Sequence, residues 1–425
     1  TRYSVFEGRG EFTNNLYLDN KGLRGDGTIY YLNSVTTTDS IFFYPYRALA
    51  HAKSHLLYEQ QSPTNCPVSK VDDASIDWRA FKDQFQSWNR ASFYETYKQK
   101  YSFDGSMILS PKALTASGDF YYDNAISVSD EYILQSQDFT ANNSEFNLFD
   151  EAGGTKIVRA KELYSAMSFK DDFGSFETLS DSTYFEMRKN KYHLYFELME
   201  WDRANKSLLF SQFSTENAWL VSVDENQDSL QFFATDASYD LTTFELEVSG
   251  VAEIFMPPVT IEPDSSYLKI LANGKIDRLH KAYFWVDSQT ETDYNFYDAE
   301  LDLLSAGRFS GSATFDYIDL EGNTQPIHFS SIEKRDGIVT GVSYIAEEDD
   351  FHLDPYFGFK GKVLLDSSKD FLTFDGFTRV HLACDKLNRT WIPFKDEVDP
   401  EDVFIDLNPE VRLTDRQQWH AGIMI

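Results

Sequence analysis

The residues with the clearest potential for chemistry are two histidines, His51 and His55, which have the i, i+4 spacing of two metal ligands on one helical face. In the zinc motif HExxH a glutamate follows the first histidine and acts as a general base. Ala52 and Lys53 follow it here, and the surrounding residues predict a helix only weakly. We therefore expect no metal site at this pair.

Two acidic runs offer the oxygen ligands that calcium prefers. Asp224, Asn226 and Asp228 alternate along the first run, but serine and threonine stand where an EF-hand loop needs its glycine and its bidentate glutamate. The second run is EEDD at 347–350. Each run predicts either a looser calcium site or an exposed acidic turn, so calcium is the one cofactor that the sequence leaves open.

Other catalytic patterns are missing from the sequence. GxSxG, GxGxxG and GxxxxGK[ST] do not occur, and the 8 histidines are scattered. Gly22, Gly25 and Gly27 form a glycine cluster, but no helical pattern follows it to bind a phosphate, so we interpret it as a turn. The 69 acidic residues could include a pair for glycoside hydrolysis, but such a pair is defined by its spatial separation of about 5 to 9.5 Å. We therefore name no catalytic residue.

The composition limits the classes of partner. With 38 basic and 69 acidic residues the formal net charge is -31, which would repel a nucleic acid unless a local basic patch were present, and none is evident. No apolar stretch approaches the roughly 18 to 20 residues of a membrane helix. Cys66 and Cys384 are either buried apolar residues or one disulfide in an oxidising compartment. Because the chain starts at Thr1, we expect it to be a piece of a longer protein.

The elements that would position any site are predicted by a recurring glycine pattern. In several segments a glycine is followed by apolar and polar residues in alternation, which is typical of half-buried strands with a bend or bulge at the glycine. These segments are 23–30, 114–122, 246–254, 309–317 and 359–365. The ambiguous stretch 156–170 is also predicted to be a strand, since its neighbours alternate. The fold class that we predict is all-β, with stacked antiparallel sheets arranged as a jelly roll, solenoid or sandwich.

One short amphipathic helix is expected to interrupt the strands. Trp78, Phe81, Phe85 and Trp88 have the i, i+3, i+7, i+10 spacing of a helical stripe, and Asp77 would be its N-cap. We therefore predict a helical insertion at 72–102, between β modules at 1–71, 103–245 and 246–425.

Aromatic residues that follow the glycine hinges are candidates for a ligand groove. We select Tyr30, Tyr121 and Phe315 as groove residues, with the alternative that their side chains only fill the core.

Two segments built on this pattern, 114–149 and 357–382, resemble the OstA-type repeats of the periplasmic bridge proteins in lipopolysaccharide transport. Segments 309–332 and 391–407 are similar to large envelope proteins of Bacteroidota. The resemblance implies short strands stacked into an open jelly-roll groove. The polar and aromatic residues of the strands depart from the transport family, so the stacked sheet is the firmer expectation and lipid carriage the weaker one.

Three functions are compatible with these features. We favour a non-enzymatic scaffold or bridging segment of a longer envelope protein, which guides an amphipathic lipid or glycan ligand or binds other envelope proteins through its edge strands. The alternatives are a secreted jelly roll that binds or hydrolyses carbohydrate, and a calcium-dependent adhesin module. We expect a periplasmic, outer-membrane-associated or secreted location.

Overall fold

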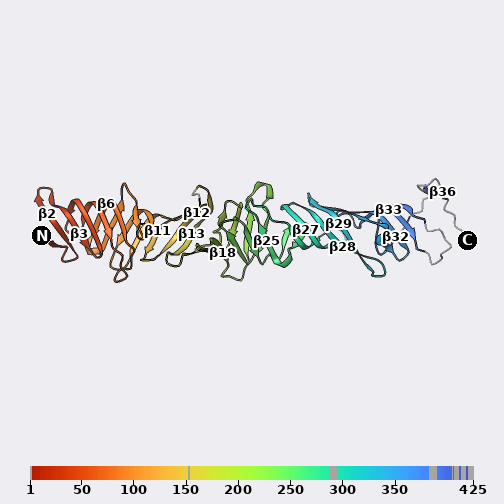
Figure 1. The fold of residues 1–425 in the computed structure, drawn as a ribbon, viewed down its shortest axis with the longest axis horizontal. Helices are drawn as coiled ribbons and strands as arrows, with labels where there is room; N and C mark the ends of the chain where they lie inside the picture. The colour runs from red at the N-terminus through yellow and green to blue at the C-terminus, as the bar shows by residue number, and fades with distance from the viewer. Residues whose placement is uncertain are drawn as a thin grey trace. The chain divides into compact units, whose positions relative to one another are not determined.

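The protein forms two compact units, each built from antiparallel strands (Figure 1). The computed structural model describes residues 2–151, 154–287, 294–381, 390–403, 405, 411–412 and 418–419. The first unit contains residues 1–218 and 236–245, and the second contains 219–235 and 246–425. The fold class is therefore all-β with stacked antiparallel sheets, as the alternation predicts. Among the described residues, no helix has the length and apolar character needed to cross a membrane.

The first unit is an antiparallel meander in which most strands pair with their neighbours in the sequence. Its strands are β1 (Arg2–Val5), β2 (Gly10–Asp19), β3 (Gly22–Tyr31), β4 (Ser34–Phe43), β5 (Ala48–Leu57), β6 (Ser69–Arg79), β7 (Gln84–Asn89), β8 (Tyr94–Thr96), β9 (Tyr101–Leu109), β10 (Leu114–Tyr122), β11 (Ala125–Leu134), β12 (Asp138–Phe149), β13 (Lys156–Ser168), β14 (Phe173–Thr178), β15 (Phe185–Met187), β16 (Tyr192–Tyr195), β17 (Leu198–Asp202), β18 (Ser207–Ser211) and β21 (Asp236–Asp240). Strand β13 confirms the prediction for 156–170.

Aromatic side chains fill the inner face of this unit. Phe120 is fully buried and contacts the rings of Phe103, Tyr132, Phe139 and Phe169 at centroid distances of 5.1 to 6.3 Å. Side chains at alternate positions of a strand point to the same face, so one face of each strand supplies the core. The high aromatic content of the sequence is thus used for packing in this part of the structure.

The predicted helix at 72–102 is wrong, because its aromatic stripe belongs to a hairpin. Strand β6 ends at Arg79, the 3-10 turn η1 (Ala80–Lys82) follows, and β7 begins at Gln84. Trp78 and Phe85 are cross-strand partners and both are buried, whereas Phe81 lies in the turn and is 39% exposed. A turn of four residues between two strands produced a spacing that imitates a helical period. Asp77, the expected N-cap, instead accepts a hydrogen bond from Nε of Arg79 at 2.9 Å.

The second unit contains a larger sheet of consecutive antiparallel strands together with shorter pairs. Its elements are β19 (Ala218–Ser222), η2 (Glu225–Gln227), β20 (Gln231–Ala234), β22 (Leu246–Ser249), β23 (Ile254–Met256), β24 (Val259–Glu262), η3 (Asp264–Ser266), β25 (Tyr267–Ile270), β26 (Leu279–Val286), β27 (Tyr294–Ser305), β28 (Arg308–Ile318), β29 (Thr324–Arg335), β30 (Ile338–Ile345), η4 (Glu347–Asp349), β31 (His352–Asp354), β32 (Phe357–Asp366), β33 (Thr373–Val380), β34 (Ile392–Glu397), β35 (Val411–Arg412) and β36 (Gln418–Trp419).

Several glycines of the recurring pattern lie at irregularities in the strands. The register between β10 and β11 shifts between Ala116 and Gly118, and the register between β28 and β29 shifts between Gly311 and Ala313. Gly250 differs, since β22 ends just before it. The segment 246–254 is therefore not one bent strand. Gly361 in the segment 359–365 lies in β32 without a register shift.

Candidate functional site

The three predicted groove residues have different surroundings. Tyr30 on β3 is partly buried, and the guanidinium of Arg2 lies 4.6 Å from its ring centroid. Tyr121 on β10 stacks on Phe93 with a centroid distance of 5.5 Å and an interplanar angle of 12°. Phe315 on β28 lines a cleft in the second unit. Phe315 thus has a cavity beside it, and Tyr30 and Tyr121 have the side-chain contacts of surface packing.

The predicted calcium ligands Asp224, Asn226 and Asp228 surround the short turn η2. The Asp224 carboxylate accepts hydrogen bonds from the backbone N–H of Asn226 at 3.0 Å and from its side-chain amide at 2.9 Å. Asp228 ends the turn in the left-handed conformation, with φ 50°. These contacts are those of a capped turn, in which the Asp224 carboxylate is directed at the backbone.

His51 and His55 lie on β5, not on a helix, and a β-bulge separates them. The register between β4 and β5 shifts at Thr38, so the two side chains leave opposite faces of the strand. His51 lies between the carboxylates of Asp39 and Asp73, at 2.9 and 2.8 Å, and these hydrogen bonds raise the pKa of its imidazole. His55 is buried against Thr36, and burial lowers its pKa to about 4. The two imidazoles do not form a common site.

Cys66 is fully buried and accepts a hydrogen bond from the side-chain amide of Asn33 at 3.1 Å. Burial is the main cause that raises the pKa of its thiol. Cys384 lies outside the described residues.

The cleft beside Phe315, here called the Phe315 cleft, has a volume of about 730 Å³. Its apolar lining includes the buried side chains of Tyr294, Tyr317, Leu372 and Val398. The hydroxyls of the two tyrosines donate to backbone carbonyls, Tyr294 to Asp370 at 3.3 Å and Tyr317 to Leu353 at 2.8 Å. These four buried apolar side chains form the inner part of the lining, and the tyrosine hydroxyls have partners of their own.

The mouth of the Phe315 cleft combines exposed apolar side chains with carboxylates. Ile318 and Leu320 are 54% and 64% exposed, and Asp319 between them is only 7% exposed. Asp399 and Glu401 also line the cleft, the first partly exposed and the second exposed. Burial acts to raise the pKa of Asp319, but hydrogen bonds from the side chain and backbone of Asn323 and from neighbouring backbone N–H groups lower it overall. Asp319 therefore carries a negative charge at neutral pH.

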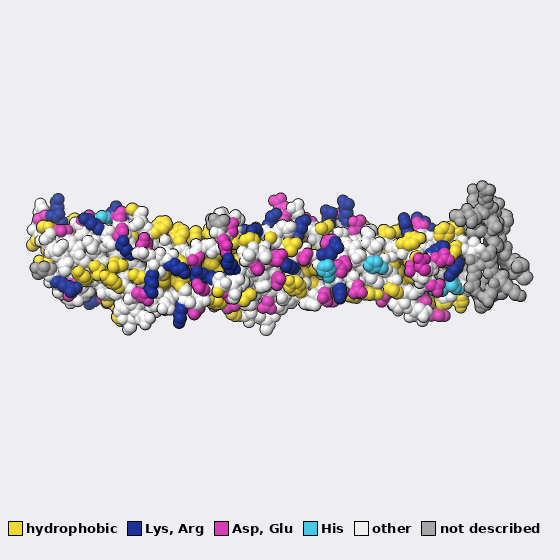
Figure 2. Space-filling model, viewed as in Figure 1, with side chains coloured by type: hydrophobic (Ala, Val, Ile, Leu, Met, Phe, Trp, Pro, Cys, Tyr) yellow, Lys and Arg dark blue, Asp and Glu magenta, His cyan; other side chains and the backbone are white. Residues whose placement is uncertain are grey.

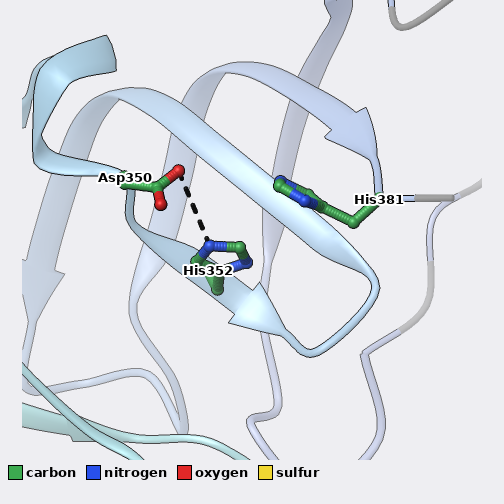
Figure 3. Close-up of side chains that lie close together, drawn as sticks. All are labelled: Asp350, His352 and His381. Atoms are coloured by element: carbon green, nitrogen blue, oxygen red, sulfur yellow. Dashed lines mark ion pairs between the residues drawn. The ribbon is translucent and has the colours of Figure 1, made fainter. Parts of the chain in front are cut away.

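A second cluster in the same unit has the residue types of a metal centre (Figure 3). Asp350, His352 and His381 each offer one ligand atom, and these atoms lie within 4.8 Å of one another. His352 Nε2 is 3.7 Å from Asp350 Oδ1, and the two imidazole centroids are 4.5 Å apart. Among the described residues, this is the one group of three histidine, cysteine or acidic side chains with such proximity.

Three neighbouring strands bring these residues together. His352 pairs with Gly358 across β31 and β32, and Gly358 pairs with Arg379 across β32 and β33. His381 follows β33, and its backbone N–H donates to the Tyr356 carbonyl at 2.7 Å. Because Gly358 has no side chain, the His381 ring can occupy the space above β32, where a Cβ on Gly358 would be 2.9 Å from His381 Nε2.

Charged groups surround this cluster. Arg379 Nη2 is 3.7 Å from Asp350 Oδ1, and Nη1 is 3.8 Å from Glu347 Oε1. The Arg379 guanidinium also lies 4.6 Å from the ring centroid of Trp391. Asp350 thus has a cation beside it.

The sequence indicated only part of this cluster. Asp350 belongs to the acidic run at 347–350, which was predicted either to bind calcium or to form an exposed turn. His352 lies two residues beyond that run, and His381 is brought to it by the β32–β33 pairing. No local spacing signals that pairing, so the histidines could not be joined to the run from the sequence.

Comparisons with protein-family models, with curated proteins and with solved structures found no match to this chain. The resemblance to OstA-type repeats accordingly stays a prediction.

Proposed function

We propose that this protein is a β-sheet scaffold of the cell envelope that holds an amphipathic ligand in the Phe315 cleft. The observation that carries the proposal is the combination of an apolar interior with an acidic mouth in one cavity of about 730 Å³. Binding pockets for small molecules are of this size and are lined mainly by apolar and aromatic side chains.

The apolar interior favours an aliphatic or aromatic body. Phe315 and Phe371 are partly exposed and border the cleft, while Leu372 and Val398 are 4% exposed. Covering such side chains with an apolar ligand stabilises the complex by about 25 cal/mol for each Å² removed from water. An acyl chain or a similar apolar group is the ligand body that we infer.

The charge at the mouth selects the head group. Asp319, Asp399 and Glu401 would repel an anionic head and attract a cationic one at the same position. The whole chain has a formal net charge of -31, which acts in the same direction at longer range. In Figure 2, acidic and basic side chains mix over the surface shown, so the acidic excess there is distributed. We therefore infer a cationic or uncharged head group.

The proposal is tested with two detergents of equal chain length used below their micelle concentrations. Isothermal titration with dodecyltrimethylammonium should show saturable binding, and dodecyl sulfate should bind at least about tenfold more weakly, which corresponds to about 1.4 kcal/mol. Val398→Phe should fill part of the cleft and weaken the binding of the cationic detergent. Tyr344→Ser is the matched control, since Tyr344 is 70% exposed on β30 and is not part of the cleft lining.

Two results would overturn the proposal. One is that the wild type binds the two detergents with the same affinity and that Val398→Phe changes neither affinity. This result would indicate non-specific adsorption. The other is saturable binding of a soluble oligosaccharide that Val398→Phe abolishes, which would favour the carbohydrate function.

A further inference from the structure

We propose that Asp350, His352 and His381 form a binding site for a divalent transition-metal ion, with Zn²⁺ as the best probe. The inference is independent of the Phe315 cleft, because it uses different residues and a different class of ligand. It also replaces the expectation of calcium at 347–350 with a site that includes only one residue of that run.

The distances are close to those of a metal centre. Zn²⁺ binds imidazole nitrogen and carboxylate oxygen at about 2.0 to 2.2 Å, so ligand atoms of a tetrahedral site lie about 3.4 Å apart. The three ligand atoms here are within 4.8 Å of one another, and His352 Nε2 is already 3.7 Å from Asp350 Oδ1. Asp350 is exposed and both histidines are partly exposed, so metal binding would close the remaining difference by side-chain rotation.

The backbone around the two histidines is fixed by specific contacts. The side chain of Gln325 on β29 accepts from the His352 N–H and donates to the His352 carbonyl, both at 2.8 Å. His381 is held by its N–H bond to Tyr356, and its ring uses the space left by Gly358. These contacts place both imidazoles on one side of β32, as Figure 3 shows. Groups that orient ligands in this way contribute to metal affinity.

The ligand types select the class of metal. Two imidazoles and one carboxylate suit zinc, copper, nickel or iron, whereas calcium and magnesium prefer oxygen ligands alone. Arg379, at 3.7 Å from Asp350, opposes a cation that is held only by charge. Imidazole nitrogens bind such ions through bond formation rather than through charge alone, so we expect them to provide most of the affinity. With three protein ligands, a tetrahedral ion keeps one position for water or another ligand.

The test uses the full chain without a polyhistidine tag, stripped with EDTA and dialysed. Titration calorimetry with Zn²⁺ should show one site, and Co²⁺ should give the visible absorption of a site with nitrogen ligands. His352→Ala and His381→Ala should each weaken Zn²⁺ binding at least about 100-fold, a larger loss than the 10- to 100-fold typical of residues that only orient ligands. His328→Ala is the matched control, since His328 is exposed on β29 and lies outside the cluster.

A second variant tests the geometry without removing a ligand. Gly358→Ala places a methyl group where the His381 ring lies, and it should weaken Zn²⁺ binding at least about tenfold while the circular dichroism spectrum is unchanged. If either histidine variant does not fold, this variant decides the question. Wild-type affinity in Gly358→Ala and in the His352→Ala, His381→Ala double variant would overturn the proposal. Equal losses in His328→Ala, or competition by millimolar Ca²⁺, would do the same.

Discussion

Gly105 and Gly118 face each other across the β9–β10 pair, and both have positive φ, at 152° and 146°. A Cβ on Gly105 would be 2.2 Å from the Ser117 carbonyl oxygen, and a Cβ on Gly118 would be 2.1 Å from that of Asp104. The two strands can approach in this way because neither residue has a side chain. Gly361 and Gly376 also face each other across β32 and β33 in the second unit, where only Gly361 has a positive φ, at 140°.

Gly105→Ala is expected to lower the free energy of unfolding by about 2 to 4 kcal/mol, because the substitution adds a backbone clash to a strained φ. Gly307→Ala is the control, since its Cβ would have ordinary contacts and Gly307 has no positive φ. Urea denaturation of both variants measures the difference. Equal stability of the two variants would show that the close approach is not required.

The hairpin at β6–β7 predicts unequal costs for its aromatic residues. Trp78→Ala should destabilise the protein by about 3 to 5 kcal/mol, because it leaves a large cavity in the core. Phe81→Ala should cost much less, since this side chain lies in the turn and is 39% exposed. Chemical denaturation of the two variants is the measurement. Similar losses for both would support the helical stripe that the sequence suggested.

His55 should make stability depend on pH. Its pKa in the folded protein is about 4, below the unfolded value of about 6.5, so the unfolded state binds the proton first as the pH falls. The free energy of unfolding should decrease between about pH 6.5 and pH 4, by roughly 3 kcal/mol in total.

His55→Gln provides the comparison for this effect, because glutamine is polar but does not titrate in the same range. Urea denaturation of both proteins from pH 7.5 to pH 4 is the measurement. The wild type should lose more of its free energy of unfolding than the variant as the pH falls. A difference in stability that is constant with pH would contradict the assignment.

Arg203 is expected to be a stabilising cation of the first unit. Its side chain is 12% exposed, forms ion pairs with Asp123 and Asp172, and lies 5.6 Å from the ring of Trp201. Arg203→Gln should reduce stability by about 2 kcal/mol, because it leaves the two carboxylates without their cation. Arg335→Gln removes an exposed pair with Asp336 and should cause no measurable change. Thermal unfolding compares the two, and equal melting temperatures would refute this role.

Much of the fold follows from local patterns. Alternation along segments such as 114–122 and 156–170 predicts strands, because the period of two is a property of the extended backbone itself. The hinge glycines were also recognisable, but their partners across the strands were not. Gly118 needs a glycine opposite it, and only the register of β9 and β10 shows that this partner is Gly105.

The sequence by itself determined the all-β class, the hinge glycines and the acidic character of the chain. The tertiary structure decided that the aromatic stripe at 78–88 is a hairpin, that a bulge separates His51 from His55, and that His381 meets Asp350 and His352. The physical reason is that strand pairing joins residues distant in sequence, and one residue of register reverses the face on which every side chain lies. Local spacing therefore predicts the elements, and pairing between elements creates the sites.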